Sequence, residues 1–323
     1  MNKPKRIGLA LGGGGARGFA HLGVLRALEK AGIPIAVYSG TSMGAILGAA
    51  FLQTKEFKKS HRKVKNFVIN YAQKFSGLNY VETDKKPNTN LFETLGRQFS
   101  RGKTLYNFLR HSHLEDESLL ENIARDFIYP CNIEDLTHKM YICSIDFKTG
   151  QAVFFNEGDC RKAVMASMSI PGYFPPQKFN DRLLYDAQAV YPVPIQVFEH
   201  EPVDLIISVD VGLPIEDDFQ VKTGVDLLFR QNDMLYTHVL SEVENCSDLV
   251  IRPDIKDVHW TEFHKMDKVI LKGMEAANDM IPQVKKMMDP NYNPTPMDER
   301  PWHNSGFGDM QRVHFMKVPS SED

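Results

Sequence analysis

Two strand–turn–helix units follow each other near the start of the chain, and each turns at a cluster of glycines. In the first, the apolar run RIGLAL leads through residues 12–18 into a helix predicted over 16–31. In the second, PIAVYSG leads through residues 40–44 into a helix predicted over 43–52. Two strands joined by a helix in one sheet form a right-handed parallel unit in nearly all known cases. The pair therefore favours a parallel sheet covered by helices.

The rest of the chain extends this alternation. The runs KMYICSID, LIISVDVG and LVIRPD are strand-like, and several are apolar on both faces, as expected where helices cover both sides of a sheet. We predict an α/β fold with three layers, α/β/α, around a mainly parallel central sheet. Residues 53–130 are more polar and predict a helical insertion or cap within a domain of residues 1–288. Residues 289–323, rich in Pro, Gly and Asn, predict an irregular C-terminal tail.

The overall composition is that of an ordinary folded protein and supports no nucleic-acid partner. Of the 323 residues, 42% are hydrophobic and 24% are charged, and the formal net charge is −3 at pH 7. No global positive field therefore draws the chain to nucleic acid or to an anionic membrane. We find neither an export signal nor an apolar run of the ~18 residues that a membrane-spanning helix needs. We expect a cytoplasmic location with transient contact at a membrane surface.

The cysteines give little support to a metal site or a disulfide framework. Cys131, Cys143, Cys160 and Cys246 stand far apart in the sequence. Zinc sites and small disulfide-rich domains usually show paired or dense cysteine spacing. Free thiols in a reducing compartment are the simpler expectation.

The pentapeptide Gly40-Thr41-Ser42-Met43-Gly44 matches the nucleophile elbow G-x-S-x-G. Its context fits, because an apolar strand precedes it and a helix follows. At so sharp a turn the two glycines avoid clashes with neighbouring backbone, and the serine is pushed outward. The helix N-terminus also places a positive dipole end beside any negative charge that develops there. Taken alone, the pentapeptide is equally compatible with a glycine turn whose serine caps the helix.

The glycine-rich loop after the first strand has three competing interpretations. Gly13, Gly15 and Gly18 formally match a dinucleotide loop, but the next strand carries no acidic residue for a ribose hydroxyl. A P-loop is excluded because no Gly-Lys-Ser/Thr follows. As an oxyanion hole, the N–H groups of Gly13, Gly14 and Gly15 would face the elbow of the adjacent strand. Arg17 either holds the loop or meets an anionic head group, and we favour the structural role.

Several blocks together resemble the patatin-like phospholipase family, especially its short bacterial members and the related catalytic domain of neuropathy target esterase. GGGARGFAHLGVLRALEKAGI is similar to the family's glycine-rich block, and GTSMGAILGAA to its elbow. AVMASMSIPGYFPP resembles the segment before the family's aspartate, and LYDAQAVYPVP falls where the motif D-G-G/A belongs. The similarity covers about residues 5–285, with 53–130 poorly matched.

The resemblance implies a serine acyl hydrolase that uses a Ser–Asp dyad and no metal or organic cofactor. By position, Ser42 is the nucleophile and Asp186 the base that takes its proton. The loop from Gly13 to Gly15 supplies the oxyanion hole, with Arg17 and Gly18 as its supporting residues. The implied substrates are phospholipids, lysophospholipids or other acyl esters. An aspartate needs a low-dielectric surrounding to act as a base near neutral pH.

One departure from the family pattern supports an alternative function. Asp186-Ala187-Gln188 replaces Asp-Gly-Gly/Ala. If the glycine needs a backbone conformation closed to residues with a Cβ, Ala187 would displace Asp186. The alternative is a catalytically weak or inactive member of the family with a lipid-binding or regulatory role. Asp210, in Asp-Val-Gly at the end of LIISVDVG, is the reserve candidate for the base.

A histidine triad is the competing mechanism among hydrolases. In the α/β-hydrolase order the histidine follows the acid, and six late histidines qualify: His200, His238, His259, His264, His303 and His314. None stands in a recognisable strand-end loop. His21, just after the glycine loop, is expected to pack or hydrogen-bond locally.

A basic segment within the predicted insertion has two interpretations. Residues 55–74 are rich in Lys and Arg, and an apolar stripe at helical spacing runs along the same segment through Val64, Phe67, Val68, Tyr71 and Phe75. Such a helix can lie on anionic lipid, or it can pack into the core with a solvated outer face. We favour core packing. The segment LYNFLRHSH at 105–113 is either a lid or a packing element.

Overall fold

The computed structural model describes residues 4–54, 56–76, 115–212, 224–302 and 313–318. Within them, nine strands form one sheet in the order β5-β6-β3-β2-β1-β7-β8, with β4 paired to β3 and β9 to β4. The strands are β1 Ile7–Leu11, β2 Ile35–Thr41, β3 Lys139–Asp146, β4 Ala152–Glu157, β5 Gln177–Phe179, β6 Arg182–Tyr185, β7 Leu205–Val209, β8 Leu249–Ile251 and β9 His314–Lys317. The α-helices are α1 Ala20–Lys30, α2 Met43–Thr54, α3 Phe57–Ser76, α6 Glu117–Phe127, α7 Cys160–Met168, α8 Gly224–Cys246 and α9 Met266–Met287.

The centre of the sheet is parallel, as the sequence predicts. The pairs β3–β2, β2–β1, β1–β7 and β7–β8 are all parallel. These are the five runs predicted as strands, and β1 and β7 are buried along their whole length. The antiparallel strands β4, β5 and β6 extend the sheet beyond β3. They were not predicted.

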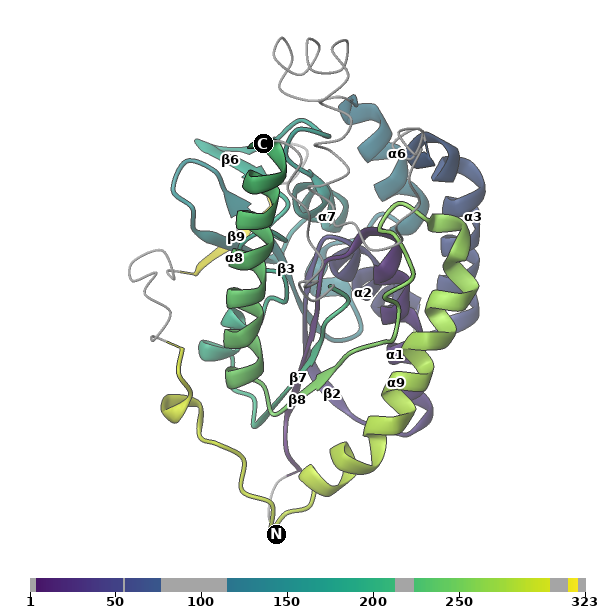
Figure 1. The fold of residues 1–323 in the computed structure, drawn as a ribbon. Coiled ribbons are helices and arrows are strands. Elements are labelled where there is room, and N and C mark those ends of the chain that lie inside the picture. Colours follow the sequence, from purple (N-terminus) through teal and green to yellow (C-terminus); the bar gives the residue numbers. More distant parts are fainter. Residues whose placement is uncertain (1–3, 55, 77–114, 213–223, 303–312, 319–323) are drawn as a thin grey trace.

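Helices cover both faces of the sheet. Figure 1 shows α1, α2 and α9 on one side and α8 on the other. Each side has its own apolar core: one contains the buried residues of α1, α2 and α9, and the other those of α8. The three-layer α/β/α arrangement predicted from the sequence is therefore present. Among the described residues, no helix combines the length and apolar character needed to cross a membrane.

The first predicted helix begins differently from expectation. Residues 16–31 were expected to form one helix, but a 3₁₀ turn, Gly15–Phe19, precedes α1. Gly15 has a φ of +55°, and the Ala16 N–H donates to the Trp260 carbonyl at 2.7 Å. The glycine loop is thereby held away from regular helical geometry.

The described part of the predicted insertion is helical and packs into the core. Val64 and Phe67 on α3 are almost fully buried, and Val68 and Tyr71 pack partly buried against the same core. The apolar stripe of this basic helix therefore serves core packing, as we favoured. The Phe75 side chain and residues 77–114, including 105–113, lie outside the described residues.

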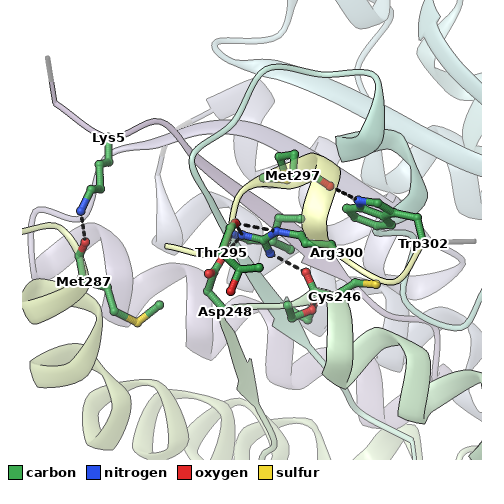
Figure 2. A network of polar contacts seen from close by, with 11 residues as sticks. Lys5, Cys246, Asp248, Met287, Thr295, Met297, Arg300 and Trp302 are labelled. Carbon is green, nitrogen blue, oxygen red and sulfur yellow. Dashed lines mark hydrogen bonds and ion pairs between the residues drawn. The ribbon is translucent and has the colours of Figure 1, made fainter. Parts of the chain in front are cut away.

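The described residues of the C-terminal segment are mostly irregular but anchored to the domain. Its β9 runs parallel to β4. Figure 2 shows Arg300 against the end of α8, where its guanidinium donates to the Cys246 carbonyl and pairs with Asp248 at 2.7 Å. The Trp302 indole donates to the Met297 carbonyl at 2.7 Å. These contacts fix the described start of the predicted tail against the α8 side of the domain.

Candidate active site

The predicted nucleophile stands at a tight turn between β2 and α2. Ser42 has a φ of +53°, a left-handed conformation that is uncommon outside glycine and is often found at functional sites. A Cβ on Gly40 would lie 2.7 Å from the backbone of Ala45, and one on Gly44 would lie 2.2 Å from the Leu11 carbonyl oxygen. Both elbow glycines are therefore required by close backbone approach, as the motif predicts.

Asp186 follows the end of β6 and is 5% exposed. Its Oδ1 accepts the Gln188 N–H at 2.9 Å. Burial raises the pKa of Asp186 to about 7, against the lowering effect of hydrogen bonding by the Ser42 side chain and the Gln188 N–H. The other carboxyl oxygen, Oδ2, is buried and accepts no hydrogen bond from the described residues. The effect of burial therefore outweighs both hydrogen bonds and keeps the pKa high.

The C-terminal end of α7 holds the backbone of both residues. The Ser167 hydroxyl oxygen accepts the Ser42 N–H at 2.8 Å, and the Ser169 carbonyl accepts the Asp186 N–H at 2.9 Å. Both serines are fully buried. One short segment thus sets the spacing between the elbow and the aspartate loop.

The backbone N–H groups of the glycine loop differ in whether a described residue accepts from them. The Gly13 N–H donates to the Pro192 carbonyl at 2.9 Å. The N–H groups of Gly14 and Gly15 donate to no carbonyl among the described residues. Of the three predicted oxyanion-hole glycines, Gly13 is thus already engaged, and Gly14 and Gly15 stay the candidates. A Cβ on Gly18 would lie 2.5 Å from Met43 Cγ, so this glycine lets the loop approach the elbow helix.

Comparison with known proteins now identifies the family. The family model for patatin-like phospholipases matches residues 9–199, more than half of the chain. The lysophospholipase NTE1 of Coccidioides immitis is 31% identical over 310 residues, which cover 87% of this chain and 18% of the relative. The chain belongs to the patatin-like phospholipase family.

Other relatives match this chain at similar identity and coverage. Patatin-like phospholipase domain-containing protein 7 of mouse is 29% identical over 297 residues, covering 83% of this chain and 20% of that protein. The chain thus spans about a fifth of the length of these curated relatives. Among solved structures, VipD from Legionella pneumophila matches with a TM-score of 0.40 and 12% identity, covering 87% of this chain and 67% of the other.

The departure from the patatin-like D-G-G/A motif does not strain the backbone. Among the described residues, Ser42 and Asn180 are the only residues other than glycine with a positive φ, and Ala187 is not one of them. Ala187 is fully buried, and its carbonyl accepts the N–H groups of Val190 and Tyr191. Ala187 therefore adopts a backbone conformation that is open to residues with a Cβ.

Arg17 is buried behind the patatin-like glycine loop. It is 3% exposed, and burial lowers the pKa of its guanidinium, whereas the charges of Tyr236 and Asp210 raise it. Its backbone N–H donates to the Gly14 carbonyl at 3.2 Å. Its Nε and Nη1 are buried without a hydrogen-bond partner among the described residues, so the role of this side chain in holding the loop stays a prediction.

The other acid–base candidates are engaged elsewhere. Asp210 pairs with Arg252 at 3.0 Å and also accepts the Gly212 N–H at 2.9 Å. His21 Nε2 lies 2.6 Å from the Gly12 carbonyl, and burial lowers its pKa to about 4, so a neutral His21 donates to the loop as expected. Among the described residues, no histidine contributes to the pKa of Asp186. His303 lies outside the described residues.

Sequence reasoning missed two residues that contact the site. Ser167 belongs to a block that resembles the family but was not predicted as a site residue, although its hydroxyl oxygen accepts the Ser42 N–H. Gln188 was noted only as a departure, but its side chain lies against the glycine loop: a Cβ on Gly13 would be 2.7 Å from Gln188 Oε1. Neither contact has a local sequence signal, because both join segments far apart in the chain.

Proposed function

We propose that this chain is a serine acyl hydrolase that releases a fatty acid from a lysophospholipid or a related acyl ester. The observation that carries the proposal is the buried Asp186 carboxyl, with a pKa of about 7, beside Ser42. A base with a pKa near the working pH is suited to take a proton and to return it. The N–H groups of Gly14 and Gly15, which have no acceptor among the described residues, support the proposal as candidate oxyanion donors.

The reaction proceeds in two steps. Asp186 takes the Ser42 hydroxyl proton as Oγ attacks the ester carbonyl, and the N–H groups of Gly14 and Gly15 bind the tetrahedral oxyanion. When the intermediate collapses, the protonated Asp186 gives its proton to the leaving alcohol, and the acyl group stays on Ser42. Water activated by Asp186 then hydrolyses the acyl-enzyme. The dyad returns to its starting protonation state.

The substrate class is proposed from the family and the printed activities of relatives. Several relatives carry the name lysophospholipase. Because this chain spans only part of their length, the activity of those whole proteins transfers here only as a proposal. Cytoplasmic residence with transient membrane contact stays a prediction.

Fatty-acid release from lysophosphatidylcholine tests the proposal. We expect release by the wild-type chain and by Ser241→Ala, which removes an exposed hydroxyl on α8. Ser42→Ala should lower the rate by at least about 10³-fold. Fatty-acid release by Ser42→Ala at the wild-type rate would rule out Ser42 as the nucleophile.

One observation favours the alternative of a catalytically weak lipid-binding relative. The Gln188 side chain lies against Gly13, close to the donors proposed for the oxyanion. If it obstructs them, lysophospholipid binds without turnover. Gln188→Ala would then raise the rate of fatty-acid release, whereas the hydrolase proposal expects little change.

A further inference from the structure

Cys131 and Cys160 face each other across a short antiparallel contact outside the candidate active site. Asn132 and Asp159 form an isolated antiparallel bridge. On one side of it the Cys160 N–H donates to the Cys131 carbonyl at 3.1 Å. Directly opposed residues of antiparallel strands have Cα atoms about 4.5–5.5 Å apart. That spacing lies within the range that a disulfide spans.

The two sulfur atoms interact with each other and with polar neighbours. The Gln53 side-chain amide donates to Cys131 Sγ at 3.0 Å. Hydrogen bonding from Cys160, helped by Gln53, lowers the pKa of the Cys131 thiol to about 7, although burial and the charges of Asp135 and Asp159 oppose this. The same hydrogen bond raises the pKa of Cys160. This contact thus favours the thiolate form of Cys131 over that of Cys160.

Lys63 adds a positive charge to this cluster. It projects from α3 and is 6% exposed, and its amino group donates to the Phe127 carbonyl and, at 3.2 Å, to Gln53 Oε1. Burial lowers the pKa of Lys63 to about 8, while the charges of Cys131 and Cys160 raise it. A cation beside a thiol is a recognised cause of thiolate reactivity.

The two remaining cysteines provide an internal comparison. Cys143 and Cys246 are buried, and burial raises the pKa of both thiols, that of Cys246 to about 11. Cys131 is partly exposed. Reactive cysteines combine access with thiolate character, whereas buried structural thiols are inert. Of the four, Cys131 alone has both properties.

We propose that Cys131 is a hydroperoxide-reactive thiol and that Cys160 is its resolving partner, so that mild oxidation joins them in a disulfide. The Cys131 thiolate attacks one oxygen of hydrogen peroxide, the O–O bond breaks, hydroxide leaves, and a sulfenic acid forms. Cys160 then attacks Cys131 Sγ. The S–S bond forms, the S–O bond breaks, and the hydroxyl leaves as water with the Cys160 proton.

The first step prepares the second. Oxidation of Cys131 removes the negative charge and the hydrogen bond that raise the pKa of Cys160. Lys63, whose charge lowers that pKa, stays beside it. The Cys160 thiolate therefore becomes easier to form only once its target sulfur is oxidised. The resulting cross-link would tie the Cys131 segment to the first residue of α7.

Peptide mapping after treatment with a slight excess of hydrogen peroxide at pH 7 tests the site. We expect a Cys131–Cys160 cross-link, a mass loss of two hydrogens and reversal by dithiothreitol in the wild-type chain and in Cys246→Ala. Cys160→Ser should instead yield a dimedone adduct on Cys131. Cys131→Ser should yield neither product. A cross-link through another cysteine, or a Cys131 sulfenic acid that never forms the disulfide in the wild-type chain, would overturn the proposal.

Alkylation of the wild-type chain gives a test that needs no variant. With iodoacetamide at pH 7, Cys131 should react at least about tenfold faster than Cys246. Because the thiolate is the reacting form, the rate of Cys131 alkylation should fall as the pH drops below about 7. Equal rates for the two cysteines would contradict the assignment.

Discussion

At the scale of single residues, the central feature is a carboxyl group whose environment shifts its protonation into the neutral range. Asp186 is buried beside Ser42, and its pKa of about 7 results from the loss of solvation of the charged form. The elbow and loop glycines could be predicted from pattern because backbone geometry demands them. The raised pKa could not, since it depends on what β6, α7 and the glycine loop bring around one side chain.

The pH dependence of hydrolysis follows from this pKa. Asp186 can accept the Ser42 proton only when ionised, so kcat/KM should rise with pH up to about 7 and then level off. A neutral ester such as p-nitrophenyl butyrate, measured from pH 5 to 9 and corrected for spontaneous hydrolysis, gives the profile. An unperturbed aspartate would instead leave the rate flat above about pH 5, contrary to this account.

Removal of the Ser167 hydroxyl should affect catalysis through position. In Ser167→Ala the buried Ser42 N–H loses its acceptor at 2.8 Å. An unsatisfied buried donor costs about 1–3 kcal/mol, and we expect kcat to fall about tenfold or more with KM nearly unchanged. Ser208→Ala is the matched control, because it removes a buried hydroxyl that pairs with Ser247 at 2.6 Å. An equal loss of kcat in both variants would assign Ser167 a merely structural role.

At the scale of elements, the parallel centre could be predicted because each of its strands is an apolar run bounded by turn residues. The antiparallel strands could not. β5 and β6 have only three and four residues, and they join through a turn at Asn180, which has a φ of +52°. So short a hairpin gives little periodic signal. The aspartate loop that follows β6 is nonetheless placed by this hairpin.

Close packing of α1 on α9 depends on a pair of glycines. A Cβ on Gly23 would lie 1.9 Å from the Ile270 carbonyl oxygen, and one on Gly273 would lie 2.0 Å from that of Ala20. Gly273→Ala must therefore separate the two backbones, and we expect a loss of about 3 kcal/mol or more in the free energy of unfolding.

Gly32→Ala is the control for this substitution. Its backbone has a φ of +69° with open space around the new methyl group, so the cost is conformational and about 1 kcal/mol. Urea denaturation of both variants measures the difference. Equal destabilisation would show that helix contact is not what Gly273 provides.

At the scale of the whole molecule, the last described segments are tied to the domain by contacts that leave no pattern in the sequence. Arg300 lies in a segment read as irregular, yet its side chain and that of Asp248 are 2% and 5% exposed, and they pair at 2.7 Å (Figure 2). Composition indicated few regular elements in this segment. It could not indicate where the segment binds, because the partner groups lie at the end of α8.

Arg300→Met should destabilise the chain strongly. It leaves Asp248 without its cation, and loss of one partner of a buried ion pair costs about 3–5 kcal/mol. Lys59→Met, which breaks an exposed pair with Glu56, should cost no more than about 1 kcal/mol. Thermal unfolding of the two variants compares them. Similar midpoints would mean that the Arg300 contact adds little to the stability of the domain.

The whole account depends on Asp186 making Ser42 reactive, and covalent labelling by a fluorophosphonate tests this most directly. We expect the wild-type chain to gain one adduct, mapped to Ser42. Asp186→Asn should react at least about 10²-fold more slowly, and Asp210→Asn should react close to the wild-type rate. Undiminished labelling of Asp186→Asn, or an adduct on a residue other than Ser42, would contradict the account.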